Sequence, residues 1–181
     1  MILSDRELVE MLREPRTRRE GFAVLVKQYS EKLYWKVRRI VLSHEDANDV
    51  LQNVFIKVWN NLQNFQGKSS LSTWLYRIAI NESLDFLRKQ KLSDRVSADE
   101  DVSVASRLMS DEYFDGDEVQ ARLQEAVARL PEVQRTVFNL KYFEEMKYSE
   151  ISQILNTSEG ALKASYHLAV KKITEYLHLF D

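Results

Sequence analysis

Residues 46–91 read DANDVLQNVFIKVWNNLQNFQGKSSLSTWLYRIAINESLDFLRKQK, and this stretch decides how the rest of the chain is organised. Its first part predicts an amphipathic helix, because apolar residues recur at steps of one and three to four. These residues are Val50, Leu51, Val54, Phe55, Val58, Trp59 and Leu62. The run QGKSS at 66–70 then breaks the pattern, as glycine and serine between periodic segments usually do. Ser70 or Ser72 is placed to cap a second helix.

The second helix of this stretch has two faces of different character. Its buried side is expected to hold Leu71, Trp74, Leu75, Ile78 and Ala79. Polar residues at steps of three and four share another face. They are Arg77, Asn81, Asp85 and Arg88, extended by Lys89 and Lys91, with the aromatic residues Trp74, Tyr76 and Phe86 among them. Because basic groups follow phosphates and aromatic rings stack on unpaired bases, this helix is a candidate for binding single-stranded nucleic acid. The alternative is a core helix with a solvated face.

Composition favours an all-α fold. The 181 residues include only four glycines and two prolines, and 44% are hydrophobic, which is enough to bury a core. No alternating run is long enough to predict a strand. The absence of cysteine excludes a disulfide framework and a thiolate metal site. No motif for a cofactor is present, and we expect none.

The chain carries no sign of a membrane segment. Its N-terminus, MILSDRELVEML, lacks a basic head followed by an apolar run, so no secretory signal is predicted. No apolar segment approaches the roughly 20 residues that cross a bilayer. We therefore expect a cytoplasmic protein that does not insert directly into a membrane.

Charge is distributed unevenly along the chain. Residues 1–93 hold 16 Lys and Arg against 11 Asp and Glu, a net charge of +5, whereas residues 94–118 hold 2 against 9, a net charge of −7. Residues 119–181 hold 8 of each kind. Because a partner meets local charge, the near-neutral total does not argue against nucleic acid. We expect two small helical domains, 1–93 and 118–181, joined by an acidic flexible linker at 94–117.

Further helices are expected before the central stretch. Ser4 or Asp5 is placed to cap a short helix that ends near Leu12. A longer helix over Arg19–Leu42 would turn one apolar stripe inward, made of Phe22, Leu25, Val26, Tyr29, Leu33, Val37 and Ile40. Its basic end, with Lys36, Arg38 and Arg39, suits either a helix C-terminus or a nucleic-acid contact. Ser43 would cap the helix that follows, with Asp46 as the capping-box acid.

The last part of the chain predicts a helix-turn-helix after two other helices. A helix over Glu118–Leu130 would bury Val119, Leu123, Ala126, Val127 and Leu130, and one over Pro131–Phe143 would bury Val133, Val137, Phe138 and Leu140. Tyr148–Leu155, a tight turn at Asn156-Thr157 and a final helix capped by Ser158 complete the pattern. The second helix of such a motif enters a major groove. Its outward candidates are Glu159, Lys163, Ala164, His167, Lys171 and Lys172, and the alternative is a plain helical hairpin.

Taken together, these stretches resemble bacterial RNA polymerase sigma factors of the extracytoplasmic-function (ECF) group within the sigma-70 family. DANDVLQNVFIKVW at 46–59 is similar to the polymerase-binding helix of that family, and GKSSLSTWLYRIAINESLDFLRKQK at 67–91 to its segment for opening the −10 promoter element. LPEVQRTVFNLKYFEEMKYSEISQIL at 130–155, followed by SEGALKASYHLAVKK at 158–172, resembles its −35 binding domain. The resemblance covers nearly everything except the linker, and the order and spacing of the motifs make the combination specific.

The resemblance implies roles for the first domain. The contact with the clamp helices of the polymerase β′ subunit would lie at Asp46, Asp49, Gln52, Phe55 and Trp59. The loop at 63–73 would hold a base flipped from the −10 element, through Asn64, Gln66, Lys68 and Ser69. The residues that would help pack or contact the melting strand are Trp74, Tyr76, Arg77, Asn81, Asp85, Arg88 and Lys89.

For the second domain, the resemblance implies contact between the 131–143 helix and the polymerase β flap. The −35 element would be met by the outward face of the last helix, that is, by Ser158, Glu159, Lys163, Ala164, His167, Lys171 and Lys172. The acidic linker would run toward the RNA exit path. The family also implies promoter DNA and an anti-sigma factor as partners, and no catalytic residue or metal.

The last helix departs from the family pattern. Ser165, Leu168 and Val170 stand where arginines are common, Ala164 replaces a frequent serine, and Asn156 stands where glycine is usual. Two-pronged arginine contacts to guanine are therefore absent from the middle of this helix. We expect Lys163, phosphate contacts and DNA shape to carry more of the −35 interaction.

Two other functions fit parts of the sequence. A helix-turn-helix regulator with an N-terminal effector domain would bind duplex DNA alone, but it would not need the aromatic and basic helix at 74–91. An enzyme would need a reactive site, and the only candidate is a set of hard or borderline metal ligands, His44, Glu45, Asp46 and Asp49. Because no paired-histidine helix or nucleophile–base pair accompanies them, we expect no enzyme activity.

Overall fold

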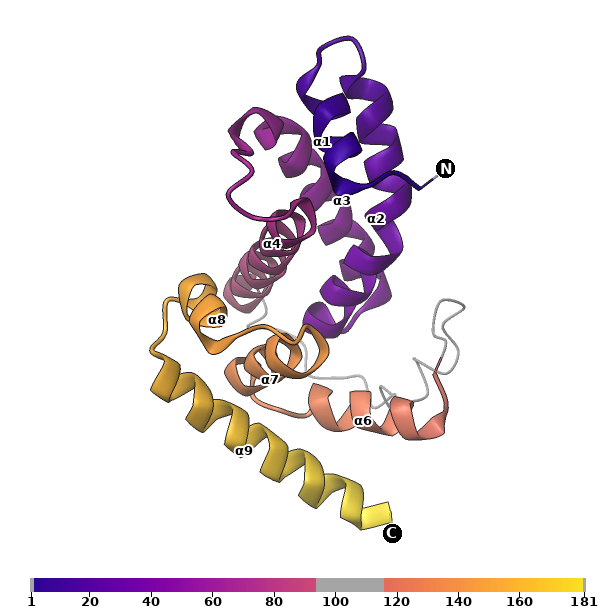
Figure 1. Ribbon diagram of the computed structural model, residues 1–181. Coiled ribbons are helices and arrows are strands. Elements are labelled where there is room, and N and C mark those ends of the chain that lie inside the picture. The colour runs from indigo at the N-terminus through magenta and orange to yellow at the C-terminus, as the bar shows by residue number, and fades with distance from the viewer. Residues whose placement is uncertain (1, 94–115, 181) are drawn as a thin grey trace. The chain divides into compact units, whose positions relative to one another are not determined.

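The computed structural model describes residues 2–93 and 116–180, and the chain divides into two compact units, Met1–Arg95 and Val96–Asp181 (Figure 1). Within the described ranges every regular element is helical, which confirms the predicted all-α class. The acidic linker predicted at 94–117 lies almost wholly outside the described residues.

The N-terminal unit is a bundle built around one long helix. Its helices are α1 (Asp5–Arg13), α2 (Arg18–Val41), α3 (His44–Asn61) and α4 (Leu71–Ser93), with a 3₁₀ turn, η1, at Leu62–Asn64. Helix α2 packs against each of the other helices, and α3 packs against α4 (Figure 1). The helices predicted from the apolar stripes are thus present, with bounds that differ by a few residues.

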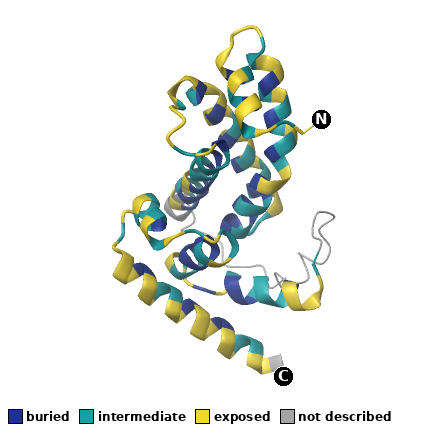
Figure 2. Ribbon diagram, in the orientation of Figure 1, coloured by how far each residue is buried: buried dark blue, intermediate teal, exposed yellow. Residues whose placement is uncertain are grey.

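The core of this unit is formed by the predicted stripes, which turn inward as Figure 2 shows. Helix α2 contributes Leu25, Leu33 and Val37, α3 contributes Val50, Val54 and Val58, and α4 contributes Leu71, Leu75, Ala79 and Ile80, all at most 2% exposed. Burial of such side chains stabilises a fold by about 1.5–3 kcal/mol each. Trp74 and Ile78, predicted to lie on the buried side of α4, are only half-buried because they sit at the edge of its apolar face.

Serine side chains begin the helices as predicted. Ser4 caps α1 and forms a capping box with Glu7. The Ser43 hydroxyl accepts the Asp46 amide at 3.3 Å at the start of α3. The Ser70 hydroxyl accepts the Thr73 amide at 3.1 Å at the start of α4. Each cap satisfies one of the free amides that a helix start leaves, and the Ser70 cap fixes the point where the segment between α3 and α4 ends.

The C-terminal unit packs α6, α7 and α8 against one long helix. Its helices are α6 (Glu118–Ala128), α7 (Glu132–Phe138), α8 (Tyr148–Leu155) and α9 (Glu159–Leu177), and α7 continues into a π-helical turn, η2, at Asn139–Phe143. Helix α9 contacts α6, α7 and α8 (Figure 1). The buried cluster between them consists of Ala126, Val127, Leu130, Phe138, Ala169 and Ile173. Between α8 and α9, Asn156 adopts the predicted left-handed conformation, with φ 50° and ψ 48°.

Val119 and Val133 were predicted to face inward, and this was wrong. Val119 is 71% exposed and Val133 is 63% exposed. Both lie in the first turn of their helices, and on α6 the buried cluster reaches Leu123 but not Val119. The apolar spacing gives the direction of a side chain but not how far the neighbouring helix extends to cover it.

Candidate functional site

One face of α3 combines acidic, polar and exposed apolar groups. Asp49 and Gln52 are exposed, and Trp59 retains 38% of its surface. At steps of three and four, Ile56 shares this face and is 58% exposed. Ile56 was not among the predicted site residues, although the spacing from Asp49 and Gln52 would have placed it there. An exposed apolar pair rimmed by polar groups is typical of a protein-binding surface.

The aromatic residues of this face rest on α2. The Trp59 ring meets the Phe22 ring edge to face, with centroids 5.0 Å apart, and Phe55 meets the same ring at 6.4 Å. Phe55 is half-buried, and so is Asp46 in the first turn of α3. The five residues predicted for polymerase contact therefore lie on one helix, with Asp49, Gln52 and Trp59 the more accessible ones.

The segment between α3 and α4 is anchored at both ends and exposed in the middle. The Asn61 side chain donates to the Lys57 carbonyl at 2.8 Å, and the Asn64 amide donates to Asn61 Oδ1 at 3.2 Å. Asn64, Gln66 and Lys68 are exposed, and Ser69 is half-buried. Gly67 has a φ of 71°, a conformation that glycine adopts without strain. Donors and acceptors are thus presented on a loop of fixed path.

The polar face of α4 adjoins this loop. Asn81, Arg88 and Lys89 are exposed, Asp85 is half-buried, and Arg88 Nη1 pairs with Asp85 Oδ1 at 2.9 Å. Arg77 is half-buried, and its Nε has no hydrogen-bond partner among the described residues.

Trp74 lies at the start of this face and is the aromatic group nearest the loop. It is half-buried, and its ring packs against Phe65 of the loop with centroids 5.1 Å apart. The structure thus brings together Trp74, Arg77, Asn81, Asp85 and Arg88 on one face.

Tyr76 lies apart from that face. It shares the side of α4 that carries Ile80, Ser83 and Leu87, which are all buried. Burial, and secondarily the charge of Asp5, raises the pKa of Tyr76. The Lys36 ammonium of α2 lies over the Tyr76 ring, 4.1 Å from its centre.

Lys36 is half-buried between α2 and α4. Burial lowers its pKa to about 8, with the charges of Arg39 and Lys32 adding to the effect. The Tyr76 ring favours the charged form of Lys36, but burial is the larger effect. At the basic end of α2, Arg38 is only 4% exposed and Arg39 is half-buried, so none of the three cations is fully exposed.

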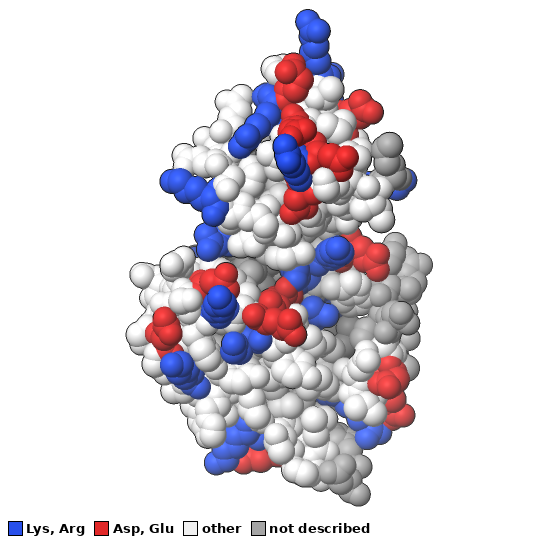
Figure 3. Space-filling model, in the orientation of Figure 1, with Lys and Arg blue, Asp and Glu red and all other residues white. Residues whose placement is uncertain are grey.

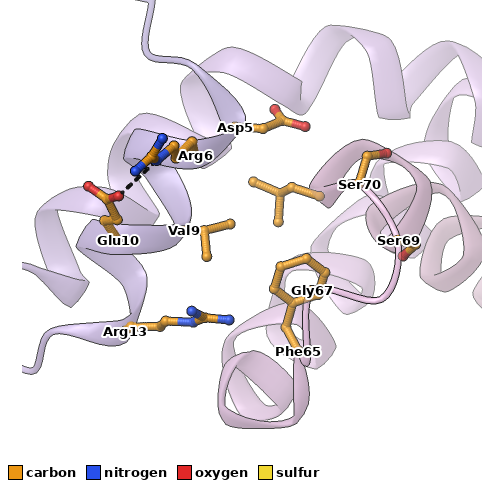
Figure 4. A pocket seen from close by; sticks show the side chains of 10 residues that line it. Asp5, Arg6, Val9, Glu10, Arg13, Phe65, Gly67, Ser69 and Ser70 are labelled. Carbon is orange, nitrogen blue, oxygen red and sulfur yellow. Dashed lines mark hydrogen bonds and ion pairs between the residues drawn. The ribbon is translucent and has the colours of Figure 1, made fainter.

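A cavity of about 330 Å³ opens between α1 and the loop that precedes α4. Figure 4 shows side chains from both segments directed into it. The lining residues are Asp5, Arg6, Val9, Glu10, Arg13, Phe65, Gly67, Ser69, Ser70 and Leu71. No sequence pattern places α1 beside this loop, because the two segments are more than 50 residues apart.

The outer face of α9 presents the predicted residues to solvent. The exposed residues are Glu159, Lys163, Ala164, His167, Lys171 and Lys172, and Ser158 caps the helix by accepting the Ala161 amide at 3.3 Å. Two apolar residues of the same helix are also accessible, Leu168 at 46% and Val170 at 39%. The helix thus offers cations at both ends of its exposed surface.

Tyr148, the first residue of α8, lies beside Lys163 at the edge of this surface. The Lys163 ammonium lies 5.7 Å from the centre of the Tyr148 ring, and the Lys141 ammonium lies 4.8 Å from it. The ring holds two cations near the start of α8, an arrangement that suits phosphate contact. Figure 3 shows basic and acidic groups interspersed on the face that it draws, so binding to a polyanion there would depend on such local arrangements.

The described residues contain no cluster of three or more side chains that could hold a metal ion. His44 was one of the candidate metal ligands in the sequence. Both of its ring nitrogens make hydrogen bonds, with Tyr34 Oη at 2.8 Å from Nδ1 and Asn48 Nδ2 at 3.0 Å from Nε2. These contacts give His44 a place in the packing of α2 against α3. In the described part of the chain, no helix is both long enough and apolar enough to span a bilayer.

Two family models match the chain. The model for sigma-70 region 2 matches residues 25–93, and the model for sigma-70 region 4 matches residues 120–173. The first covers α3, the loop and α4 together with most of α2, and the second covers α7, α8 and most of α9. Helix α1 lies outside both matches.

Curated relatives match most of the chain. It is 33% identical over 157 residues to the ECF RNA polymerase sigma factor SigW of Bacillus subtilis, covering 82% of this chain and 84% of that protein. It is 31% identical over 182 residues to the RNA polymerase sigma-H factor of Pseudomonas aeruginosa, covering 96% and 93%.

Solved structures share the fold. One is the sigma factor RpoE in complex with the anti-sigma factor NepR from Bartonella quintana, with a TM-score of 0.70 and 21% identity over 88% of this chain and 98% of that chain. Another is CnrH in complex with the cytosolic domain of CnrY, with a TM-score of 0.66 and 22% identity over 98% of this chain and 99% of that chain.

Proposed function

The chain belongs to the sigma-70 family of RNA polymerase sigma factors, in its ECF group, and from this membership we propose how its parts divide the work of transcription initiation. A sigma factor binds core RNA polymerase and directs it to promoter DNA. We assign polymerase binding and −10 recognition to residues 1–93 and −35 recognition to residues 118–181. The acidic segment 94–117 connects the two activities. The rival regulator, which would bind duplex DNA without polymerase, does not account for the match to region 2.

The loop between α3 and α4 is the observation that supports the assignment of −10 recognition to residues 1–93. It is tied by Asn61 and Asn64 at one end and by the Ser70 cap at the other, and its middle is exposed beside the polar face of α4. Extruding a base from duplex DNA costs a few kcal/mol. A preformed loop that binds the extruded base recovers this cost only at matching sequences, so recognition and melting become one event. Asn64, Gln66, Lys68 and Ser69 would bind the base, while Trp74, Arg77, Asn81, Asp85, Arg88 and Lys89 follow the strand.

Polymerase binding is assigned to the exposed face of α3. Asp49 and Gln52 supply polar contacts, and Trp59 supplies an apolar anchor that is braced by Phe22. Aromatic anchors of this kind carry much of the binding energy in protein interfaces. We assign the partner as the β′ clamp helices, with Asp46 and Phe55 supporting the face from positions that are half-buried. The 131–143 segment, which includes the exposed Tyr142, would face the β flap.

The −35 element is assigned to α9. Lys163, His167, Lys171 and Lys172 reach solvent from one helix that follows a helix turn of the DNA-binding type. Because Leu168 and Val170 occupy exposed positions that could have held arginines, guanine readout by paired arginine contacts is not available there. Phosphate contacts and DNA shape would supply most of the affinity.

Regulation is assigned to a protein partner. The structure of RpoE that shares this fold contains the anti-sigma factor NepR, and we propose that an anti-sigma factor also binds this chain. The chain would work in the cytoplasm, where RNA polymerase is found, and would act by binding, without a catalytic site or cofactor of its own.

Promoter opening tests the −10 assignment. With holoenzyme on a promoter fragment, permanganate should modify unpaired thymines in the −10 element. Asn64→Ala and Asn81→Ala should lower this signal while core binding is retained, because both side chains are exposed and away from the α3 face. Unchanged opening in both variants would overturn the assignment.

A further inference from the structure

We propose that α1 belongs to the −10 site, and that Arg13 at its C-terminal end binds a phosphate of the unpaired promoter strand held by the loop at 64–70. This inference rests on the proposed function of that loop. Helix α1 lies outside both family-model matches, which begin at residue 25. The contact is therefore argued from the cavity between α1 and the loop.

The cavity has the walls that a nucleotide needs. Its volume of about 330 Å³ falls in the range of small-molecule sites, and it is open to solvent. The loop supplies the Phe65 ring and the hydroxyls of Ser69 and Ser70, while α1 supplies charged side chains (Figure 4). One wall can thus donate hydrogen bonds and pack against an apolar surface, and the other can bind charge.

Among the charged side chains that line the cavity, Arg13 is the one without a partner in the described residues. Asp5 accepts a hydrogen bond from the Tyr29 hydroxyl at 2.5 Å. Glu10 pairs with Arg6 Nε at 3.2 Å. The Arg13 side chain is exposed and makes no hydrogen bond or ion pair with any described residue. An unpaired guanidinium beside donors favours an anionic ligand such as a phosphodiester.

The Arg13 side chain lies beside Gly67 of the loop. A Cβ built on Gly67 would lie 3.7 Å from Arg13 Nη2, so the guanidinium lies directly beside the loop backbone. Figure 4 shows Arg13 extending across the cavity toward Gly67 and Phe65. Gly67 has a φ of 71°, so its backbone conformation favours glycine, while the 3.7 Å separation is ordinary van der Waals contact. A strand lying on the loop at Gln66 or Lys68 would pass within reach of Arg13.

The cavity carboxylates do not block this approach. Asp5 lies eight residues before Arg13 on α1, roughly 12 Å away at the helical rise. Glu10 is turned toward Arg6, away from the loop (Figure 4). A phosphate would therefore enter at the edge formed by Arg13 and Gly67.

The test is the affinity of holoenzyme for a single-stranded −10 oligonucleotide, measured over a range of salt concentrations. Arg13→Ala should raise Kd about 3- to 5-fold, the effect of one exposed ion pair. It should also lower the log–log salt slope by about 0.7, the value for one phosphate contact on a single strand. Arg13→Lys should restore most of both. Arg16→Ala is the matched control, because Arg16 is exposed, lies three residues on and does not line the cavity.

Neutral methylphosphonate linkages distinguish a phosphate contact from a structural role. At one position of the oligonucleotide, the neutral linkage should weaken wild type but not Arg13→Ala, because the two changes remove the same contact. If Arg13→Ala weakens oligonucleotide binding equally wherever the neutral linkage is placed, this inference is wrong and the proposed function stands. The same holds if Arg13→Ala leaves oligonucleotide binding unchanged while Asn81→Ala weakens it. If wild-type holoenzyme does not bind the oligonucleotide at all, both are wrong.

Discussion

The ammonium nitrogen of Lys36 lies 4.1 Å from the centre of the Tyr76 ring, which joins the basic end of α2 to the middle of α4. Tyr76 and Asn81 were both predicted to help pack or contact the melting strand. In the structure the two residues have different surroundings, since Tyr76 is half-buried under a lysine and Asn81 is exposed. We therefore expect a Tyr76 variant to lose stability but not DNA affinity, and an Asn81 variant to lose DNA affinity but not stability.

Tyr76→Ala should lower the free energy of unfolding by about 2 kcal/mol, somewhat less than for a fully buried aromatic residue. Asn81→Ala should change it by no more than about 0.5 kcal/mol, as expected for an exposed residue. In holoenzyme binding to a −10 oligonucleotide, only Asn81→Ala should raise Kd. Denaturant unfolding and fluorescence anisotropy measure the two quantities. Tyr76 would be a direct DNA contact if its variant were as stable as wild type but bound DNA poorly.

Stability should depend on pH through Lys36. Its folded pKa of about 8 lies below the ordinary lysine value of 10.5, so the charged form destabilises the fold at lower pH. This penalty should fade as pH rises from about 8 to 10.5, because over this range the folded chain has released a proton that the unfolded chain still binds. Allowing for solvent screening, Lys36→Met should gain about 1 kcal/mol at pH 7.

The difference between wild type and Lys36→Met is the quantity to measure, because tyrosines also titrate at the upper end of this range. Lys27→Met is the control, since Lys27 is exposed on α2 and its charge is not among the causes that lower the pKa of Lys36. The pKa assignment would be contradicted if the difference stayed constant between pH 7 and 10.5.

Core binding should depend on the α3 face. Trp59→Ala, or Asp49→Ala together with Gln52→Ala, should weaken binding to core polymerase by at least about 1 kcal/mol. Ile56→Ala should weaken it too, because Ile56 shares the exposed face. Lys27→Ala on α2, which is exposed elsewhere, is the control. If the folded variants bound core polymerase with full affinity, the assignment of the α3 face to this interface would be wrong.

Lys163 should contribute to promoter binding but not to binding of core polymerase. Lys163→Ala should weaken holoenzyme binding to a promoter fragment and lower its salt dependence, because a cation near DNA phosphates is lost. Affinity for core polymerase should not change. Arg122→Ala on α6, where Arg122 pairs with Glu118, controls for loss of a charge elsewhere in the unit. An unchanged footprint at −35 would count against the assignment.

The helix-turn-helix could be predicted because its signals are local. Tyr148–Leu155 has the predicted bounds, Ser158 caps α9, and Asn156 is left-handed. Caps and turns depend on the chemistry of a few neighbouring residues, so the order of residues is enough to find them.

Features that depend on distant neighbours could not be predicted in the same way. Val119 has the spacing of a buried residue, but within the described residues it is 71% exposed and lies outside the buried cluster. The wall of the cavity formed by α1 faces a loop far along the chain, and no periodicity relates Arg13 to Gly67. Tyr76 lies among charges in the sequence, yet it points to α2 because the apolar face of α4 is wider than its stripe predicts.

Transcription in a purified system tests the central claim most directly. Core bacterial polymerase is incubated with promoter fragments from the chain's own genome, with and without the chain, and start sites are mapped. We predict start sites that arise only with the chain and share −35 and −10 elements. If no start sites arise and the chain alone protects a site on duplex DNA, it acts as a regulator and not as a sigma factor.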